Sequence, residues 1–136
     1  APRNYGMSEA EVNEKTMEAL KVVHIEQLKD KQIYKLSGGE KKLASIATIL
    51  STEPDVILMD EPSVALDPKN RNLINILNQL NQAKIIASHD LNMIMDTCER
   101  TILLSDGKVI KDGNTKEILL DKELMEESGL ELPLGY

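Results

Sequence analysis

The chain has 136 residues, of which 41% are hydrophobic, so it can bury one core and is too short for two independent ones. Its formal net charge of −7 argues against a nucleic-acid partner, because nucleic-acid binding needs a basic surface. The single cysteine, Cys98, excludes an internal disulfide and indicates a reducing compartment.

The first part of the chain is predicted to be helical. Ser8 and Glu11 have the spacing of a capping box, and apolar residues follow at helical spacing over residues 12–23. Ser37 and Glu40 repeat the same spacing and predict a second helix start. The inward face of that second helix is formed by Leu43, Ile46, Ala47 and Leu50.

After residue 53 the hydrophobic period changes from helical to strand-like. Residues 56–59 form a short apolar run, typical of a strand that is buried on both faces. Strands and helices then alternate, which implies right-handed crossovers and a parallel sheet flanked by helices. The further elements expected are a helix beginning at Asp67-Pro68, a strand over 84–88, a helix over 91–98 and a strand over 101–105.

The last part of the chain begins with a hairpin. Asp106-Gly107 is a typical two-residue turn and predicts that the strand over 101–105 pairs with one over 108–112. Asn114 is then expected to cap a helical tail, with a further helix near residues 122–128.

Ser37-Gly38-Gly39 is a candidate phosphate-binding turn. The first amide N–H groups of a helix have no partner inside it, and the helix dipole adds positive potential there. Glycines let a phosphate approach the backbone without a Cβ in the way, and Ser37 can donate its hydroxyl. The alternative is that Ser37 and Glu40 only cap a helix.

Asp60 and Glu61 form a candidate metal and catalytic pair. They follow the apolar run directly, at the carboxyl end of a strand, where doubly wound sheets bind ligands. Pro62 is expected to keep Glu61 extended. Two carboxylates repel a triphosphate unless Mg²⁺ lies between them, so one acid is expected to hold hydrated metal and the other to polarise water. The alternative is a surface turn with two solvated acids.

His89 follows the next strand, in Ser88-His89-Asp90. A lone histidine in such a place is more often structural. Its position one strand along from Asp60 and Glu61 favours a second interpretation, in which it stabilises a terminal phosphate by hydrogen bonding. A phosphate loop of the form G-x-x-x-x-G-K-[ST] does not occur anywhere in the sequence.

Taken in this order, the motifs resemble those of the ABC-type ATPases. Residues 36–40 are similar to the signature motif, 56–62 to the Walker B strand, 65–67 to the D-loop, and His89 to the switch histidine. The spacing and the ending of the chain resemble the energy-coupling-factor or cobalt/nickel branch of prokaryotic importers. The resemblance covers nearly the whole chain but little over half of a complete nucleotide-binding domain, whose phosphate loop and Q-loop lie upstream.

The resemblance implies a role for each motif residue. Ser37, Gly38 and Gly39, with Glu40 where glutamine is commoner, would contact the γ-phosphate of ATP held by a second ATPase subunit. Asp60 would hold Mg²⁺ through water, and Glu61 would be the general base. His89 would contact the γ-phosphate, and Asp67 would link the two sites of the dimer.

The resemblance also implies partners and a location. The parent protein would couple ATP hydrolysis to uptake of a metal ion or vitamin, bound to integral membrane subunits at the cytoplasmic face of the cell membrane. The implied fold is the C-terminal part of a P-loop NTPase domain. Its expected divisions are part of the helical signature subdomain (1–53), part of the RecA-like core (54–112) and a helical tail (113–136).

Two alternatives to a catalytic subunit are a non-catalytic fragment that donates its signature turn to an intact ATPase, and a soluble ABC protein of DNA repair or translation. The isolated chain is expected to be inactive, because it has no phosphate loop to position the phosphates. Such positioning supplies most of the catalysis in phosphoryl transfer. It is also expected to self-associate through an exposed sheet edge.

Overall fold

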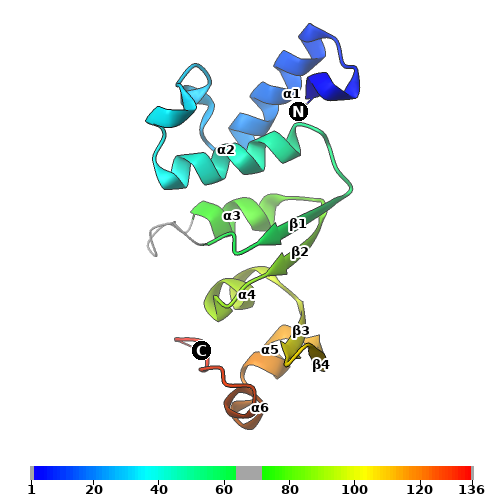
Figure 1. Ribbon diagram of the computed structural model, residues 1–136, viewed down its shortest axis with the longest axis vertical. Helices are drawn as coiled ribbons and strands as arrows, with labels where there is room; N and C mark the ends of the chain where they lie inside the picture. The colour runs from blue at the N-terminus through cyan, green and yellow to red at the C-terminus, as the bar shows by residue number, and fades with distance from the viewer. Residues whose placement is uncertain (1, 64–71, 136) are drawn as a thin grey trace. The chain divides into compact units, whose positions relative to one another are not determined.

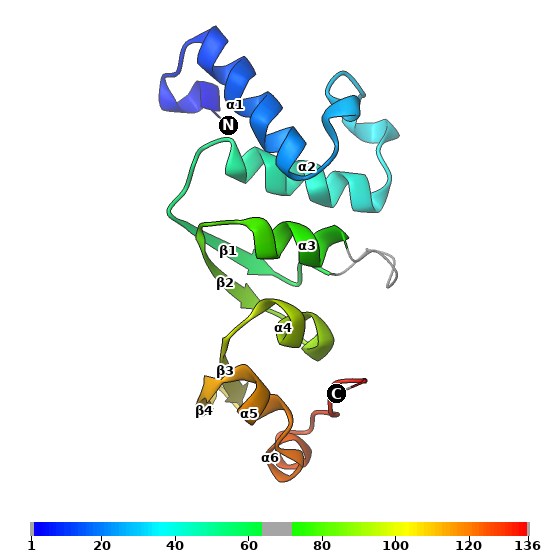
Figure 2. The same ribbon diagram turned by 180° about the vertical axis from the view of Figure 1, so that it is seen from behind.

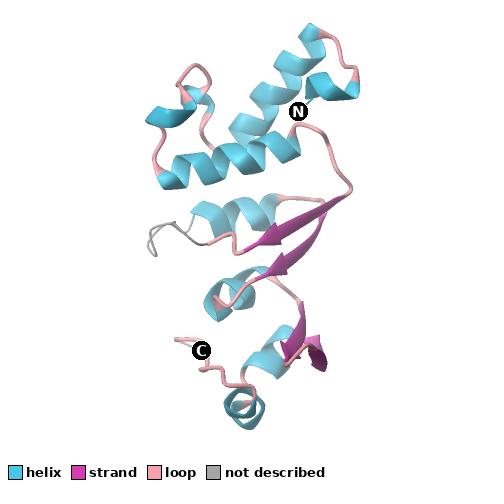
Figure 3. Ribbon diagram, viewed as in Figure 1, coloured by secondary structure: helices cyan, strands magenta, loops and turns pink. Residues whose placement is uncertain are grey.

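The computed structural model describes residues 2–63 and 72–135. Both helices and strands occur along the chain (Figure 3). The chain divides into two compact units, Ala1–Ile85 and Ile86–Tyr136. Within the described ranges, no helix has the length and apolar character needed to cross a membrane. The predicted boundaries at residues 53/54 and 112/113 remain predictions.

The first unit opens with two α-helices, α1 (Glu9–Val22) and α2 (Gly38–Leu50). Both predicted capping boxes are confirmed, with Ser8 capping α1 and Ser37 capping α2. The two helices pack against each other, and Ala19 of α1 and Ile46, Ala47 and Leu50 of α2 are buried, whereas Leu43 is half-buried. Three short 3₁₀ turns accompany them: η1 (Pro2–Tyr5), η2 (Glu26–Leu28) and η3 (Ile33–Lys35).

The same unit continues with strand β1 (Val56–Asp60), helix α3 (Asn72–Gln79) and strand β2 (Ala83–Ala87), whose last residues belong to the second unit. The two strands are hydrogen-bonded neighbours, and their arrows run the same way in Figure 3. Helix α3 is drawn below α2 and at the level of β1 in Figure 1 and Figure 2. Its apolar stripe is fully covered, at Leu73, Ile76 and Leu77. The helix start expected at Asp67-Pro68 lies outside the described residues.

The prediction that β1 is buried on both faces is wrong. Ile57 is 3% exposed, whereas its neighbours Val56 and Leu58 are 50% and 70% exposed. Ile85 of β2 is also exposed, at 62%. Successive side chains of a strand point to opposite faces. The β1–β2 pair therefore has one covered face and one apolar face that the described residues leave exposed.

The second unit is built around α5. Its elements are α4 (Leu91–Thr97), β3 (Arg100–Ser105), β4 (Lys108–Asn114), α5 (Thr115–Leu119) and α6 (Lys122–Glu127). Helix α5 contacts all four of the others. Asn114 caps α5, as predicted, by accepting from the backbone N–H groups of Lys116 and Glu117. The buried residues of this unit include Met93, Ile94, Met95, Leu103, Ile118, Leu119 and Met125.

Strands β3 and β4 form the predicted antiparallel hairpin, with Ser105 opposite Lys108. Asp106 and Gly107 both have positive φ, at 50° and 72°, as a type I′ turn requires. The prediction that β3 extends a parallel sheet is wrong for the described residues, where β1–β2 and β3–β4 are separate two-stranded sheets. The apolar run predicts the strand, whereas its pairing is set by the tight turn, which joins β4 to β3.

Candidate functional site

The first turn of α2 presents backbone donors at an exposed position. Ser37 is the N-cap residue, and its side chain accepts a hydrogen bond from the backbone N–H of Glu40 at 3.2 Å. Gly38 and Gly39 are the first two helical residues, whose N–H groups have no acceptor within an α-helix. Ser37 and Gly38 are exposed. The turn can therefore cap its helix and still offer amides and a hydroxyl to an anion.

Glu40 closes the same turn from the other side. Its Oε2 accepts a hydrogen bond from the backbone N–H of Ser37 at 2.7 Å, and its Oε1 lies 3.3 Å from Nζ of Lys31. These interactions lower the pKa of the Glu40 carboxyl. The largest cause is the hydrogen bond from the backbone N–H of Ser37, and the next is the hydrogen bond with the Ser37 side chain. Glu40 is thus an ionised partner of Ser37 and holds the turn in shape.

The backbone changes direction at the end of β1. Asp60 is the last residue of the strand and is exposed, and Glu61 is half-buried. The prediction that Pro62 keeps Glu61 extended is wrong, because Glu61 has a φ of 45°. Left-handed backbone costs a residue other than glycine roughly 1–2 kcal/mol, so the surrounding structure must hold it there.

A lysine of α2 holds this strained residue. Nζ of Lys42 donates a hydrogen bond to the backbone carbonyl of Glu61 at 3.2 Å. Lys42 is not among the residues predicted from the sequence. The signal that could have found it is its spacing, because Lys42 stands four residues before the buried Ile46 and so lies on the inward side of the helix. A lysine on that side needs a polar partner.

His89 lies between β2 and α4 in the second unit, and its side chain is exposed. Its neighbours Ser88 and Asp90 start α4: the backbone N–H of Asp90 donates to Ser88 Oγ, and Asp90 Oδ1 accepts from Met93. The structure thus brings the α2 turn and the Asp60-Glu61 turn into one unit and places His89 on the other. Convergence of His89 with Glu61 stays a prediction, and Asp67 lies outside the described residues.

The donors at the end of β1 fit a hydrated Mg²⁺ ion better than a metal enclosed by protein. Across residues 2–63 and 72–135, no group of three or more His, Cys, Asp or Glu side chains is arranged to hold a metal ion. Mg²⁺ commonly keeps several waters and takes one or two carboxylates plus substrate phosphates. The exposed carboxylate of Asp60 meets that requirement.

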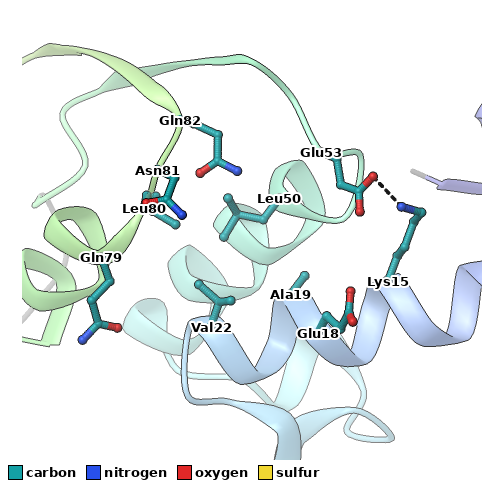
Figure 4. Close-up of a pocket in the computed structure, with 10 residues that line it drawn as sticks. All are labelled: Lys15, Glu18, Ala19, Val22, Leu50, Glu53, Gln79, Leu80, Asn81 and Gln82. Carbon is teal, nitrogen blue, oxygen red and sulfur yellow. Dashed lines mark ion pairs between the residues drawn. The ribbon is translucent and has the colours of Figure 1, made fainter.

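A cavity of about 220 Å³ lies elsewhere in the first unit (Figure 4). It is lined by residues of α1 and by residues at the C-terminal ends of α2 and α3, including Leu50 and Leu80. The ion pair between Lys15 and Glu53 forms part of its wall and raises the pKa of Lys15, chiefly through their hydrogen bond. No residue predicted to bind nucleotide lines this cavity.

Comparison with known proteins gives the family. A family model described as ABC transporter matches residues 2–64. A protein of Geobacter sulfurreducens, named as an ABC transporter ATP-binding protein, is 45% identical over 98% of this chain and 54% of its own length. The energy-coupling factor transporter ATP-binding protein EcfA of Methanosphaera stadtmanae is 40% identical over 97% of this chain and 49% of its own.

The solved structures agree with these relatives. The cbiO1 protein of Clostridium perfringens, described as part of the ABC transporter complex cbiONQ, is 36% identical and superposes with a TM-score of 0.77. The match covers 89% of this chain and 50% of that one. The chain thus spans about half the length of the curated relatives it matches. It belongs to the ABC transporter ATP-binding proteins, is related to the energy-coupling-factor ATPases, and has their mixed α/β fold.

Proposed function

We propose that this chain supplies the signature turn and the catalytic acids of an ABC ATPase that drives uptake of a metal ion or vitamin. The observation that carries the proposal is the direct link between α2, which begins with Ser-Gly-Gly, and the Asp60-Glu61 strand end, made by Lys42. One unit therefore holds both a set of anion-binding donors and a pair of carboxylates.

The turn at Ser37, Gly38 and Gly39 binds the terminal phosphate of ATP. Ser37 and Gly38 are exposed. The amides and hydroxyl of the turn suit the three charged oxygens of a γ-phosphate, and the dipole of α2 favours negative charge at this end. Glu40 keeps the turn in shape through its two bonds with Ser37. The ATP bound here is held by a second ATPase subunit, as the family resemblance implies.

The acids at the end of β1 perform the hydrolytic step. Asp60 holds hydrated Mg²⁺, which neutralises charge on the phosphates when bound. Glu61 accepts a proton from the attacking water, and His89 stabilises the γ-phosphate by hydrogen bonding. Asp67 links the two sites of the dimer. Neutralising the charge on the phosphates and orienting the attacking water account for most of the catalysis in this class of reaction.

The partners proposed for the whole protein follow from its relatives. EcfA is named as an energy-coupling factor transporter protein, and cbiO1 is described as part of a transporter complex. By analogy, the ATPase that contains this chain works at the cytoplasmic face of the cell membrane with integral membrane subunits, which choose the transported substrate.

The test is ATP hydrolysis by the complete ATPase, in which this chain is joined to a segment carrying a phosphate loop. Glu61→Gln should lower kcat by about 10²- to 10⁴-fold, the usual contribution of a general base. Glu123→Gln, which changes an exposed acid of α6, is the matched control and should leave kcat unchanged. Equal activity of the wild type and the Glu61 variant would contradict the proposal.

The exposure of Ser37 and Gly38 favours a second candidate function, in which the chain donates its signature turn to an intact ATPase. The isolated chain should then show no hydrolysis above background, yet change the activity of an intact relative on mixing. Ser37→Arg should abolish that change. Robust hydrolysis by the isolated chain that depends on Glu61 would exclude this candidate.

A further inference from the structure

We infer that Lys42 is a positioning residue for Glu61, acting through the backbone carbonyl at the end of β1. The inference rests on the proposed function, in which Glu61 is the general base. It adds a residue outside the signature and strand-end motifs to the machinery of hydrolysis, and it gives that residue one defined task.

The contact is specific to one of two adjacent lysines. Lys42 is half-buried, and its Nζ lies 3.2 Å from the carbonyl oxygen of Glu61. Lys41, one residue earlier on α2, is exposed. Side chains of neighbouring helical residues point about 100° apart, so only Lys42 is directed toward the strand end.

The carbonyl that Lys42 holds belongs to the strained peptide. Glu61 has a φ of 45°, and the next residue, Pro62, is fully buried. The peptide between them is therefore fixed on one side by the buried ring and on the other by a charged donor, whose hydrogen bonds are stronger than those of neutral groups. Without the donor, the backbone of Glu61 can relax from its left-handed conformation.

Relaxation of this backbone would displace the carboxylate of Glu61, because the side chain and the carbonyl leave the same residue. Small displacements of a catalytic group have large effects on rate, up to about a hundredfold for 1 Å. They affect substrate binding less, since the phosphates are held by other groups. Loss of Lys42 should therefore reduce kcat and leave KM for ATP nearly unchanged.

The contact itself is tested in this chain by carbonyl ¹³C NMR. Lys42→Met removes the charged donor and keeps a long apolar side chain, and Lys41→Met is the matched control. The Glu61 carbonyl signal should move to higher field in Lys42→Met and stay in place in Lys41→Met. An unchanged Glu61 signal in Lys42→Met would overturn the inference.

The catalytic consequence is tested in the complete ATPase. Lys42→Met should lower kcat by about ten- to a hundredfold, with KM close to that of the wild type, and Lys42→Arg, which keeps a charged donor, should recover most of the loss. Lys41→Met should match the wild type. A wild-type kcat in Lys42→Met, or a loss that Lys42→Arg does not recover, would overturn the positioning role.

The two failures can be told apart. If the Glu61 variant of the complete ATPase hydrolyses ATP normally, the proposed function fails, and the positioning role fails with it. If Glu61 is essential and Lys42→Met is fully active, the proposed function stands and only the inference about Lys42 is wrong.

Discussion

Ser37 and Glu40 hold each other across the first turn of α2. The backbone N–H of Ser37 donates to Glu40 Oε2 at 2.7 Å, and the backbone N–H of Glu40 donates to Ser37 Oγ at 3.2 Å. Ser8 and Glu11 make the same pair of bonds at the start of α1. The chain thus contains two copies of one local device, of which only the second is proposed to bind phosphate, and each serves as a control for the other.

Replacing either capping serine by alanine should weaken its helix by a similar amount. Ser37→Ala and Ser8→Ala should each cost about 1 kcal/mol in the free energy of unfolding, because each removes an N-cap acceptor. Only Ser37→Ala should also slow ATP hydrolysis by the complete ATPase. Denaturant titration and a kinetic assay on both variants decide this. An equal loss of activity in the two variants would mean that Ser37 acts through helix stability alone.

The two capping glutamates should respond differently to loss of their serines. Both have a lowered pKa, but the largest cause is the serine side chain for Glu11 and the serine backbone N–H for Glu40. Ser8→Ala should therefore raise the pKa of Glu11 more than Ser37→Ala raises that of Glu40. Carboxyl ¹³C titration measures both values, and the reverse order would contradict the assignment of causes.

The same lowered pKa values give the capping boxes a pH dependence of known sign. A carboxyl whose pKa is lower in the folded state stabilises that state above its ordinary pKa, near 4.5, and loses this contribution as the pH falls through the folded value. Both helices should therefore fray in acid, below about pH 4.5. Glu11→Gln and Glu40→Gln should each remove part of this dependence, as followed by circular dichroism.

Local features were predictable because they depend on residues close in sequence. The capping boxes at Ser8 and Ser37 need only a residue three positions on, and the turn at Asp106-Gly107 needs two residues that tolerate positive φ. These predictions were confirmed. The strand at residues 56–59 was also found, since its apolar run is strong.

Long-range features were not predictable in the same way. The apolar run of β1 suggested burial on both faces, yet Leu58 is exposed, because burial depends on whether another layer covers that face. At the site, the carboxylates were identified from their place after a strand. The left-handed φ of Glu61 was not, and neither was its bond to Lys42, which joins residues 19 positions apart.

The hairpin turn offers a test of backbone conformation separate from packing. Gly107 has a φ of 72° and open space where a Cβ would stand, so Gly107→Ala should cost roughly 1–2 kcal/mol from backbone strain alone. Gly113→Ala is the matched control, because a Cβ there would meet Ile118 at 3.8 Å, an ordinary contact. That variant should be neutral or slightly stabilising. Similar losses in both variants would indicate that the strand, rather than the turn, is sensitive.

Two adjacent residues of β1 allow its covered face and its open apolar face to be tested separately. Ile57 is 3% exposed, so Ile57→Ala should cost about 2–5 kcal/mol in the free energy of unfolding. Leu58 is 70% exposed, so Leu58→Ala should change this free energy by only about 0.5 kcal/mol.

The open face should instead govern how the isolated chain associates. Val56, Leu58 and Ile85 are 50%, 70% and 62% exposed, and they can bury this apolar area only against another molecule or segment. Leu58→Lys should therefore reduce the self-association of the isolated chain in light scattering, with little change in its unfolding midpoint. If the wild-type chain is strictly monomeric, or if Leu58→Lys unfolds it, this face is not what joins the copies.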